Sequence, residues 1–383
     1  MGRMEHIDED LTLYRDMLIR CLEREVLPHY DQWEKQGHMP REVWNMLGAA
    51  GMLGPDMPEE YGAAGAPFEV NLMILEETCR LGLAGLSTGL NVHANIVMPY
   101  VNNIGTPEQK AHWLPKMASG EVIGAIGMTE PGAGSDLAGM RTNAVRDGDE
   151  YVINGSKIFI TNGLNAGLVV LAAKTDPSKG AKGISLFLVD TSLSGFKKGK
   201  GIEKIGQHTS DTAELFFDNL RVPASALLGE ENKGFVYLMQ ELPRERVGVA
   251  TQAVGACEGA MALTVDYVTQ RKAFGQAVSQ FQNTRFKMAE LRAEIELVKA
   301  YLAQCTARCK AGVMSTEEAS ILKLTSTELQ CKVTDTCLQL FGGYGYTQEY
   351  PISRFYLDAR VQTIYAGTSE IMKEMIARGV LGR

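Results

Sequence analysis

The stretch 151-YVINGSKIFITNG-163 decides the fold class, because it carries the clearest β signal in the chain. Short apolar runs lie on both sides of Asn154-Gly155, a dipeptide typical of a two-residue hairpin turn, so we expect two antiparallel strands here. No helix-length pattern separates the apolar runs that follow, which favours an antiparallel barrel or sandwich over alternating strands and helices. These further strands are expected at residues 168–173, 184–189 and 213–217.

Helical patterns flank this β segment on both sides. Upstream, apolar residues recur at three- to four-residue spacing from Leu11 to Leu22, and Thr106-Pro107 is suited to open a later helix as its N-cap and first residue. Downstream, two long patterns are sufficient for a helical bundle. The helices expected beyond the first are residues 40–50, 69–83, 107–118, 281–311 and 316–341.

Length and composition set the class of protein. A chain of 383 residues with 45% hydrophobic and 22% charged residues is a globular protein too long for one core, so two or three domains are expected. We predict an α+β protein with a helical domain at residues 1–121, an antiparallel β domain at residues 122–229 and a helical bundle domain at residues 230–383.

Charge and residue spacing exclude several functions. The net charge is −8 and Lys and Arg form no block, which argues against nucleic-acid binding. No apolar run reaches the roughly 18 residues of a membrane span, so no membrane association is expected. Seven cysteines without CxxC and six histidines without HExxH predict no metal site. The polar, acidic N-terminus resembles neither a secretory signal nor a transit peptide, so we expect a cytoplasmic protein or the mature form of a mitochondrial one.

Four short segments could bind a ligand through backbone N–H groups, although each has a plainer structural interpretation. Small residues in 128-MTEPGAGSD-136 let the backbone approach a ligand, but a Gly-rich segment is often only a turn. In 159-FITNG-163 an aromatic and a hydroxyl are expected to share one strand face, where a Phe is usually core. The segments 339-QLFGGYGY-346 and 365-YAGTSEI-371 suit a helix C-terminus and N-terminus, and helix N-termini favour anions.

A fifth segment, 241-ELPRERV-247, carries Glu245 between Arg244 and Arg246. Such a cluster is ordinarily a solvated group of surface charges. In an apolar pocket, burial would raise the pKa of Glu245 and a neighbouring cation would lower it. The sequence pattern alone leaves both readings open.

Taken together and in this order, the five segments resemble the acyl-CoA dehydrogenase family over nearly the whole chain. The motifs at residues 128–139 and 339–358 are specific to that family, and residues 358–362 and 366–370 reinforce the match. The resemblance implies a helical N-terminal domain, a middle β domain and a C-terminal four-helix bundle. It also implies a homotetramer, built as a dimer of dimers, with FAD between the β domain and the bundle.

The resemblance assigns the FAD contacts to two sets of residues. The first would surround the flavin, where Phe159 replaces the Trp of many relatives; it comprises Ile126, Met128, Thr129, Gly134, Ser135, Phe159, Ile160, Thr161, Thr368, Ser369 and Glu370. The second would reach the adenosine diphosphate part of a flavin held by the partner subunit; it comprises Arg271, Gln282, Gln339, Gly342 and Gly343.

The reaction that the resemblance implies is α,β-desaturation of an acyl-CoA thioester, in which a base removes the α-proton while hydride leaves the β-carbon for flavin N5. The thioester oxygen needs stabilisation as it gains enolate character, here from the backbone N–H of Ala366. Medium- and short-chain members carry their catalytic Glu at position 366, and Ala cannot accept a proton. Long-chain and isovaleryl members place it just before an Arg on the helix that begins the C-terminal domain, which corresponds to Glu245. The substrate contacts implied are Ser135, Val236, Pro243, Arg244, Arg246, Ala366 and Gly367.

The substrate and the electron acceptor remain open at this stage. Residues 227–234, 241–243 and 371–374 resemble long-chain members, whereas residues 366–370 lean towards isovaleryl members. Gly89, at the expected end of the acyl cavity, would leave depth for a chain. We expect a medium- to long-chain dehydrogenase that passes electrons to an electron-transferring flavoprotein. The alternatives are an isovaleryl-type dehydrogenase, an oxidase that reduces oxygen, and a DNA-associated relative, which the acidic charge disfavours.

Overall fold

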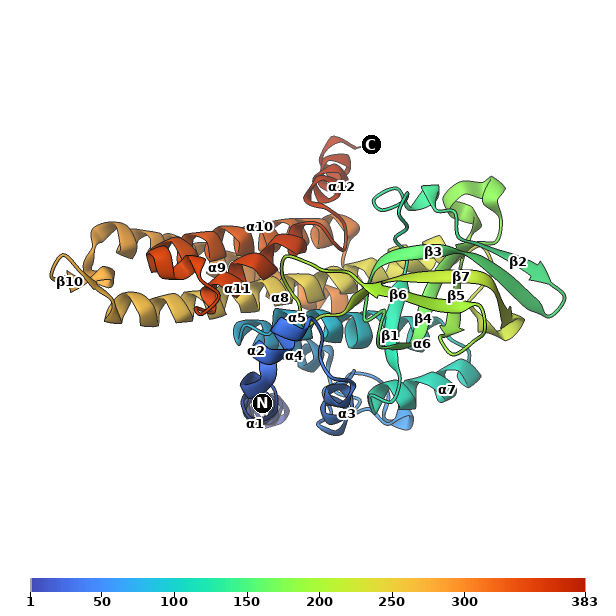
Figure 1. The fold of residues 1–383 in the computed structure, drawn as a ribbon, viewed down its shortest axis with the longest axis horizontal. Coiled ribbons are helices and arrows are strands. Elements are labelled where there is room, and N and C mark those ends of the chain that lie inside the picture. Colours follow the sequence, from blue (N-terminus) through green and yellow to red (C-terminus); the bar gives the residue numbers. More distant parts are fainter. Residues whose placement is uncertain (1, 383) are drawn as a thin grey trace.

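The computed structural model describes the backbone of residues 2–382 and the side chains from residue 11 onward. Figure 1 shows helices at the N-terminal end of the chain in blue, a β domain in green at the right, and long helices in yellow to red that extend to the left. The predicted order of helical, β and helical parts is therefore confirmed. Within the described residues, no helix is both long and apolar enough to cross a membrane.

The N-terminal part is helical throughout. Its helix α7 opens as predicted: the Thr106 hydroxyl accepts from the N–H of Gln109, and the Gln109 side chain accepts from the N–H of Thr106, which forms a capping box. The middle stretch from α5 to α6 was not predicted, because it is almost wholly buried as far as Val101 and so shows no amphipathic pattern. The elements are α1 (Gly2–Glu25), α2 (Leu27–Gln36), α3 (Arg41–Ala49), η1 (Glu59–Tyr61), α4 (Phe68–Arg80), α5 (Ala84–Leu90), the π-helix η2 (Asn91–Val97), α6 (Met98–Ile104) and α7 (Pro107–Ala118).

The β domain is built on one sheet with strand order β6-β7-β3-β2-β4-β5-β8, and β1 pairs with β4. The prediction of a purely antiparallel domain was wrong in one respect, since β4 runs parallel to both β1 and β2. Neither parallel pair is a hairpin, because β2 and β3 lie between β1 and β4 in the chain, and β3 lies between β2 and β4. The strands are β1 (Ile123–Gly127), β2 (Asn143–Asp147), β3 (Glu150–Thr161), β4 (Ala166–Lys174), β5 (Ile184–Asp190), β6 (Phe196–Gly201), β7 (Thr212–Pro223) and β8 (Leu227–Leu228).

The hairpin predicted at Asn154-Gly155 was also wrong. Strand β3 continues through this dipeptide, and the actual turn joins β2 to β3 at Gly148, whose φ is 62°. The pairing of β3 with β7 shifts register between Ile153 and Gly155, so the glycine marks a bulge. A Cβ on Gly155 would lie 2.4 Å from Thr142 Oγ1. The glycine is therefore needed for close approach of two backbones rather than for a turn.

The C-terminal part is a bundle in which α8, α9 and α10 pack lengthwise, α11 lies on α8 and α10, and α12 packs against α10. The predicted long helices at residues 281–311 and 316–341 are confirmed as α9 and α10. The strands β9 and β10 lie at the far end of the bundle from the β domain (Figure 1). The elements are α8 (Gly234–Gln270), β9 (Lys272–Ala273), β10 (Gln276–Ala277), α9 (Gln282–Lys310), α10 (Thr316–Phe341), α11 (Ile352–Ala359) and α12 (Ser369–Leu381).

Helix α8 connects the domains through its burial. Val247 and Ala250 belong to the same hydrophobic cluster as Leu18 and Trp44 of the N-terminal helices, and Ala256 and Ala260 pack in a second cluster with α9, α10 and α11. Most side chains between residues 245 and 261 are buried, so both faces of the helix are covered. A polar residue in this part of α8 is therefore enclosed by two domains.

Candidate active site

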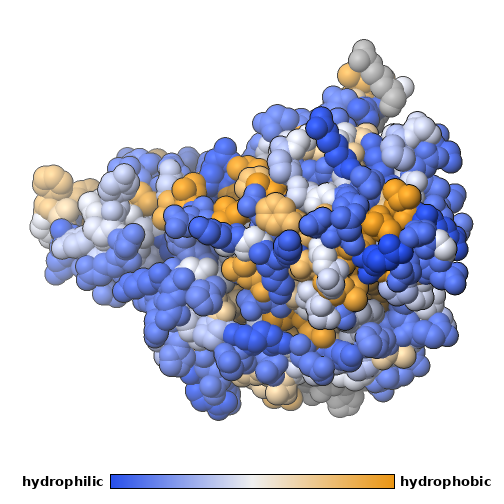
Figure 2. Space-filling view, turned by 45° about the vertical axis from the view of Figure 1, so that its right-hand side comes forward, coloured by the Kyte–Doolittle hydropathy of each residue, from blue (hydrophilic) through white to orange (hydrophobic). Residues whose placement is uncertain are grey.

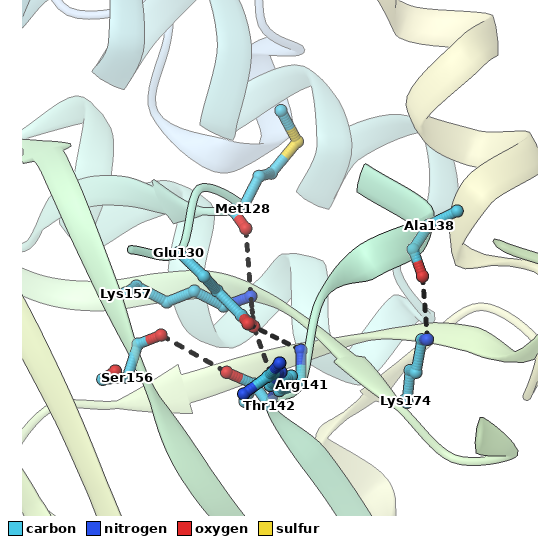
Figure 3. Close-up of polar contacts among 8 residues, drawn as sticks. All are labelled: Met128, Glu130, Ala138, Arg141, Thr142, Ser156, Lys157 and Lys174. Carbon is cyan, nitrogen blue, oxygen red and sulfur yellow. Dashed lines mark hydrogen bonds and ion pairs between the residues drawn. The ribbon is translucent and has the colours of Figure 1, made fainter. Parts of the chain in front are cut away.

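The segment 128–136 is anchored to the β domain by one buried ion pair (Figure 3). The Nζ of Lys157 lies 2.9 Å from the carboxylate of Glu130 and donates to the carbonyl of Met128 at 3.0 Å. Glu130 also accepts from the N–H groups of Arg141 and Thr142, at 2.6 and 2.9 Å. Burial alone would raise the pKa of Glu130, but the hydrogen bonds from Thr142 and Lys157 hold it below its ordinary value. Burial lowers the pKa of Lys157 to about 8.

This anchor brings the first two predicted flavin segments together. The N–H of Ile158 donates to the carbonyl of Thr129 at 2.9 Å, so the segment crosses β3 beside Phe159. Phe159 is 62% exposed and has a φ of 60°, at a register shift of β3. A large exposed aromatic in that conformation is uncommon and fits a flat ligand that covers its ring. Ile160, by contrast, is buried in the β core, so only its backbone could contact a ligand.

The part of the same segment that carries glycine and hydroxyl residues is accessible to a ligand. Ser135 is exposed, and a Cβ on Gly134 would meet no atom within 4 Å. Thr129, Thr161, Met128 and Ile126 are partly exposed. The residues present therefore fit a flavin, since an exposed ring, hydroxyl groups and accessible backbone lie where the segment 126–135 crosses the end of β3.

The second set of predicted FAD residues meets at the far end of the bundle. Arg271, Gln339, Gly342 and Gly343 line one open depression of about 470 Å³. The guanidinium of Arg271 lies 5.6 Å from the ring centre of Tyr344. Gln282 is exposed at the start of α9 and is not part of the depression's lining. Figure 1 shows this end and the β domain at opposite ends of the molecule, so the two sets do not face each other within one chain.

Glu245 is buried, with 6% of its surface exposed, so the solvated-cluster reading of residues 241–247 was wrong at this position. The hydroxyl of Tyr100 donates to its Oε1 at 3.0 Å. Burial raises the pKa of Glu245 to about 7, although the hydrogen bond from Tyr100 and the charge of Arg246 lower it in part. A carboxylate with a pKa near neutrality is suited to act as a general base.

The loop that carries Ala366 lies beside the same part of α8. Lys323 of α10 donates to the carbonyl of Gly367 at 2.7 Å, and a Cβ on Gly367 would lie 3.8 Å from a guanidinium nitrogen of Arg246. Arg246 is itself buried and donates to Ser320 at 3.2 Å. The two alternative positions for the base, 245 and 366, are therefore on adjoining elements.

The backbone of this loop has an unusual conformation. Ala366 has a φ of 52° and Gly367 a φ of 97°, and a residue with a Cβ rarely adopts the former. Thr368 then caps α12 by accepting from the N–H of Ile371, as its sequence position suggested. Ser369 is buried and Glu370 is exposed in the first turn of α12.

The other predicted substrate residues are placed differently. Arg244 forms an ion pair with Asp56 and lies 4.1 Å from the ring centre of Phe68, so it joins α8 to the N-terminal helices. Pro243 lies inside α8, about two turns after Val236, whose side chain is exposed. Gly89 is buried, and a Cβ there would meet Asn162 Oδ1 at 3.0 Å, so Asn162 packs closely against this glycine.

Sequence patterns missed Tyr100, Lys323 and Lys157. Tyr100 and Lys323 sit in helices without any motif, and only the fold brings them to the site. Lys157 offered a signal, since it lies four residues after the buried Ile153 on one strand, at a position where an apolar residue is expected. Within the described residues, no group of His, Cys, Asp and Glu side chains is arranged to hold a metal ion.

Comparison with known proteins identifies the family and the fold. Three family models match: acyl-CoA dehydrogenase N-terminal domain at residues 8–121, middle domain at residues 125–220 and C-terminal domain at residues 232–381. The mitochondrial long-chain specific acyl-CoA dehydrogenase of Sus scrofa is 47% identical over 371 residues, which cover 96% of this chain and 86% of the relative.

Solved structures agree. Acyl-CoA dehydrogenase from Geobacillus kaustophilus superimposes with a TM-score of 0.95 at 47% identity, covering 97% of this chain and 98% of that one. Glutaryl-CoA dehydrogenase from Mycobacterium smegmatis in complex with FADH2 superimposes with a TM-score of 0.92 at 30% identity, covering 99% and 96% of the two chains. The chain therefore belongs to the acyl-CoA dehydrogenase family of FAD-dependent oxidoreductases.

Proposed function

We propose that this protein desaturates medium- to long-chain acyl-CoA thioesters to trans-2-enoyl-CoA, with Glu245 as the base that removes the α-proton. The observation that carries the proposal is a buried carboxylate at position 245 where position 366 holds Ala. The bound FAD supplies the hydride acceptor. The remaining steps depend on the residues of this chain.

Glu245 fits the base for three reasons. It is enclosed between two domains, so the proton it accepts is shielded from water. Its pKa of about 7 keeps a large fraction ionised at neutral pH while leaving it basic enough to take a proton. Arg246 and Lys323, both buried beside Gly367, put positive charge near the place where negative charge develops on the substrate.

We assign the backbone N–H of Ala366 as the hydrogen-bond donor to the thioester oxygen of the substrate. A backbone donor needs no particular side chain, so Ala can replace Glu at this position without loss of that contact. Lys323 holds the next carbonyl, that of Gly367, at 2.7 Å. This contact fixes the loop and so keeps the donor in place, which is the requirement for stabilising an oxyanion.

The FAD contacts are proposed to come from two subunits. Phe159, Thr161 and the segment 126–135 would contact the flavin, together with Thr368, Ser369 and Glu370. Arg271, Gln282 and residues 339–343 would reach the adenosine diphosphate part of the partner's FAD. The separation of the two sets in Figure 1 supports this assignment. The exposed Phe274 at the end of the bundle, 97% accessible, also suits contact with a second copy in a homotetramer.

The hydrophobic surface supports such an assembly. Figure 2 shows hydrophobic residues gathered in a band across the middle of the molecule and again at the end of the bundle. We propose that a dimer of dimers covers these surfaces, that Ser135, Val236, Pro243, Arg246 and Gly367 contact the substrate, and that an electron-transferring flavoprotein is the acceptor. We leave Arg244 out of the proposed substrate contacts, because its side chain pairs with Asp56 and packs on the ring of Phe68.

The central experiment is anaerobic reduction of the bound flavin by acyl-CoA thioesters from C4 to C18, with isovaleryl-CoA included. The wild-type flavin should bleach fastest with medium to long chains; fastest bleaching by isovaleryl-CoA would assign the branched-chain reaction instead. Glu245→Gln should keep its yellow colour and lose reduction rate by about 10²- to 10⁴-fold, the usual contribution of a general base. Glu241→Gln, one turn earlier on α8 and partly exposed, is the matched control.

The electron acceptor needs a separate measurement. Turnover with an electron-transferring flavoprotein should exceed turnover with oxygen alone. Rapid formation of peroxide in air would show that the protein is an oxidase.

A further inference from the structure

Glu245 lies on α8, but its hydrogen-bond donor comes from another domain. Tyr100 of α6 is wholly buried, and its hydroxyl donates to Glu245 Oε1 at 3.0 Å. Burial raises the pKa of Tyr100 well above its ordinary value, so the phenol stays protonated and remains a donor. Among the described residues, no second side chain donates to the Glu245 carboxylate, so Oε2 is left for another proton.

The helix that delivers Tyr100 is irregular at the place where it meets α8. Helix α5, the π-helix η2 and α6 follow one another without a break from residue 84 to residue 104. A π-helical turn accommodates an extra residue and so rotates the face presented by the helix after it, and such turns are frequent at functional sites. Tyr100 is the third residue of α6, directly after η2.

Buried amide side chains fix η2 against α8. Asn95 donates to Asn91 at 2.9 Å, Asn91 donates to Gln252 of α8 at 3.2 Å, and Gln252 donates to Ser87 at 3.0 Å. All four side chains are buried. These hydrogen bonds hold the carboxamides in place, while Asn95 Oδ1 is buried without a partner.

Gly248 is the residue of α8 against which two of these amide side chains pack. A Cβ at that position would lie 2.3 Å from Asn95 Nδ2 and 2.6 Å from Asn91 Oδ1, so only a glycine lets the amides approach α8 this closely. Polar contacts therefore connect the same helical stretches along their length: Gln252 with Ser87 and Asn91, Arg244 with the carbonyl of Asn95, Glu245 with Tyr100, and Glu241 with Asn103. Together these contacts hold α6 against α8 at the register in which Tyr100 meets Glu245.

We propose that Tyr100 is the positioning residue of the base: its hydroxyl holds Glu245 Oε1 and turns Oε2 towards the substrate α-carbon. This inference rests on the proposed function, because it assumes that Glu245 removes the proton. It goes beyond that function by naming the group from the N-terminal domain that orients a base supplied by the C-terminal domain.

The contact has a chemical consequence. A hydroxyl that donates to a carboxylate stabilises the ionised form, so it opposes the effect of burial. Without it, Glu245 would need a higher pH to ionise and would lose its fixed orientation. Hydrogen bonds to charged groups are strong enough to shift an acid-dissociation constant by roughly tenfold or more.

The test is Tyr100→Phe in the FAD-loaded enzyme, with the rate of flavin reduction followed from pH 5.5 to 9.5. The acid limb of the profile should move to higher pH by roughly one unit, so that the rate below the wild-type midpoint falls about tenfold. An infrared titration of the Glu245 carboxyl, assigned by difference from Glu245→Gln, should move in the same direction without depending on turnover. Flavin content should remain unchanged.

Tyr151→Phe is the matched control. Tyr151 is also buried and its hydroxyl also donates to a carboxylate, that of Glu231 at 3.1 Å, but it lies in the β domain. Loss of that hydroxyl should leave the acid limb in place, and an equal shift in both variants would show only a general effect of losing a buried hydroxyl.

The two proposals fail in different ways. Undiminished flavin reduction in Glu245→Gln would overturn Glu245 as the base, and the role of Tyr100 with it. An inactive Glu245→Gln together with a Tyr100→Phe profile that coincides with the wild type would refute the positioning role and leave the base intact.

Discussion

Replacement of Glu245 by Gln should stabilise the folded protein while it slows flavin reduction by acyl-CoA. Burial raises the pKa of Glu245 from 4.5 to about 7. At about 1.4 kcal/mol per pH unit, keeping this carboxylate ionised in the folded state costs about 3 kcal/mol relative to the unfolded chain. Gln keeps the shape and still accepts the Tyr100 hydroxyl, but carries no charge.

The direction in which the stability of the wild type changes with pH follows from proton binding by Glu245. Between pH 4.5 and 7 the folded protein holds a proton on Glu245 that the unfolded chain has released, so wild-type stability falls as pH rises through this window. Above pH 7 both states are ionised and the loss is complete. The variant lacks this dependence, so its advantage should be small near pH 5 and reach about 3 kcal/mol at pH 8.

Denaturant unfolding of the FAD-loaded protein at pH 5, 6.5 and 8 measures this difference. Glu349→Gln, which neutralises an exposed carboxylate of the same domain, should show no such growth with pH. If Glu245→Gln is no more stable than the wild type at pH 8, or if its advantage is independent of pH, the carboxylate is not ionised in a buried site and the reasoning fails.

Three further outcomes are expected. Lys157→Met should leave Glu130 buried without its ion-pair partner and loosen the flavin segment, so the apoprotein should bind FAD at least roughly tenfold more weakly in a fluorescence titration; unchanged affinity would contradict the anchoring role. Ala366→Glu in a Glu245→Gly background should recover measurable flavin reduction, since the two positions adjoin; complete inactivity with FAD still bound would count against a shared pocket. Arg271→Ala should lower the flavin-to-protein absorbance ratio after gel filtration, and full retention would argue against a contact with the partner's FAD.

Local sequence was informative where a short stretch decides its own structure. The capping box at Thr106 and Gln109 and the long helices α9 and α10 follow from nearby residues, and so were predictable. The turn predicted at Asn154-Gly155 was wrong because residues distant in sequence decide the structure there. Its turn signal is real, but pairing of β3 with both neighbours and the approach of Thr142 determined a bulge.

The sequence by itself determined the order of the domains, the family, and the exchange that leaves Ala at position 366 and places a carboxylate at position 245. Only the tertiary structure decided that this carboxylate is a buried group rather than a surface charge. Burial depends on α8 being covered by the N-terminal helices and α10 together, and the contact with Tyr100 joins residues 145 positions apart. Desolvation and long-range hydrogen bonding arise from packing between domains, which no local pattern of residues encodes.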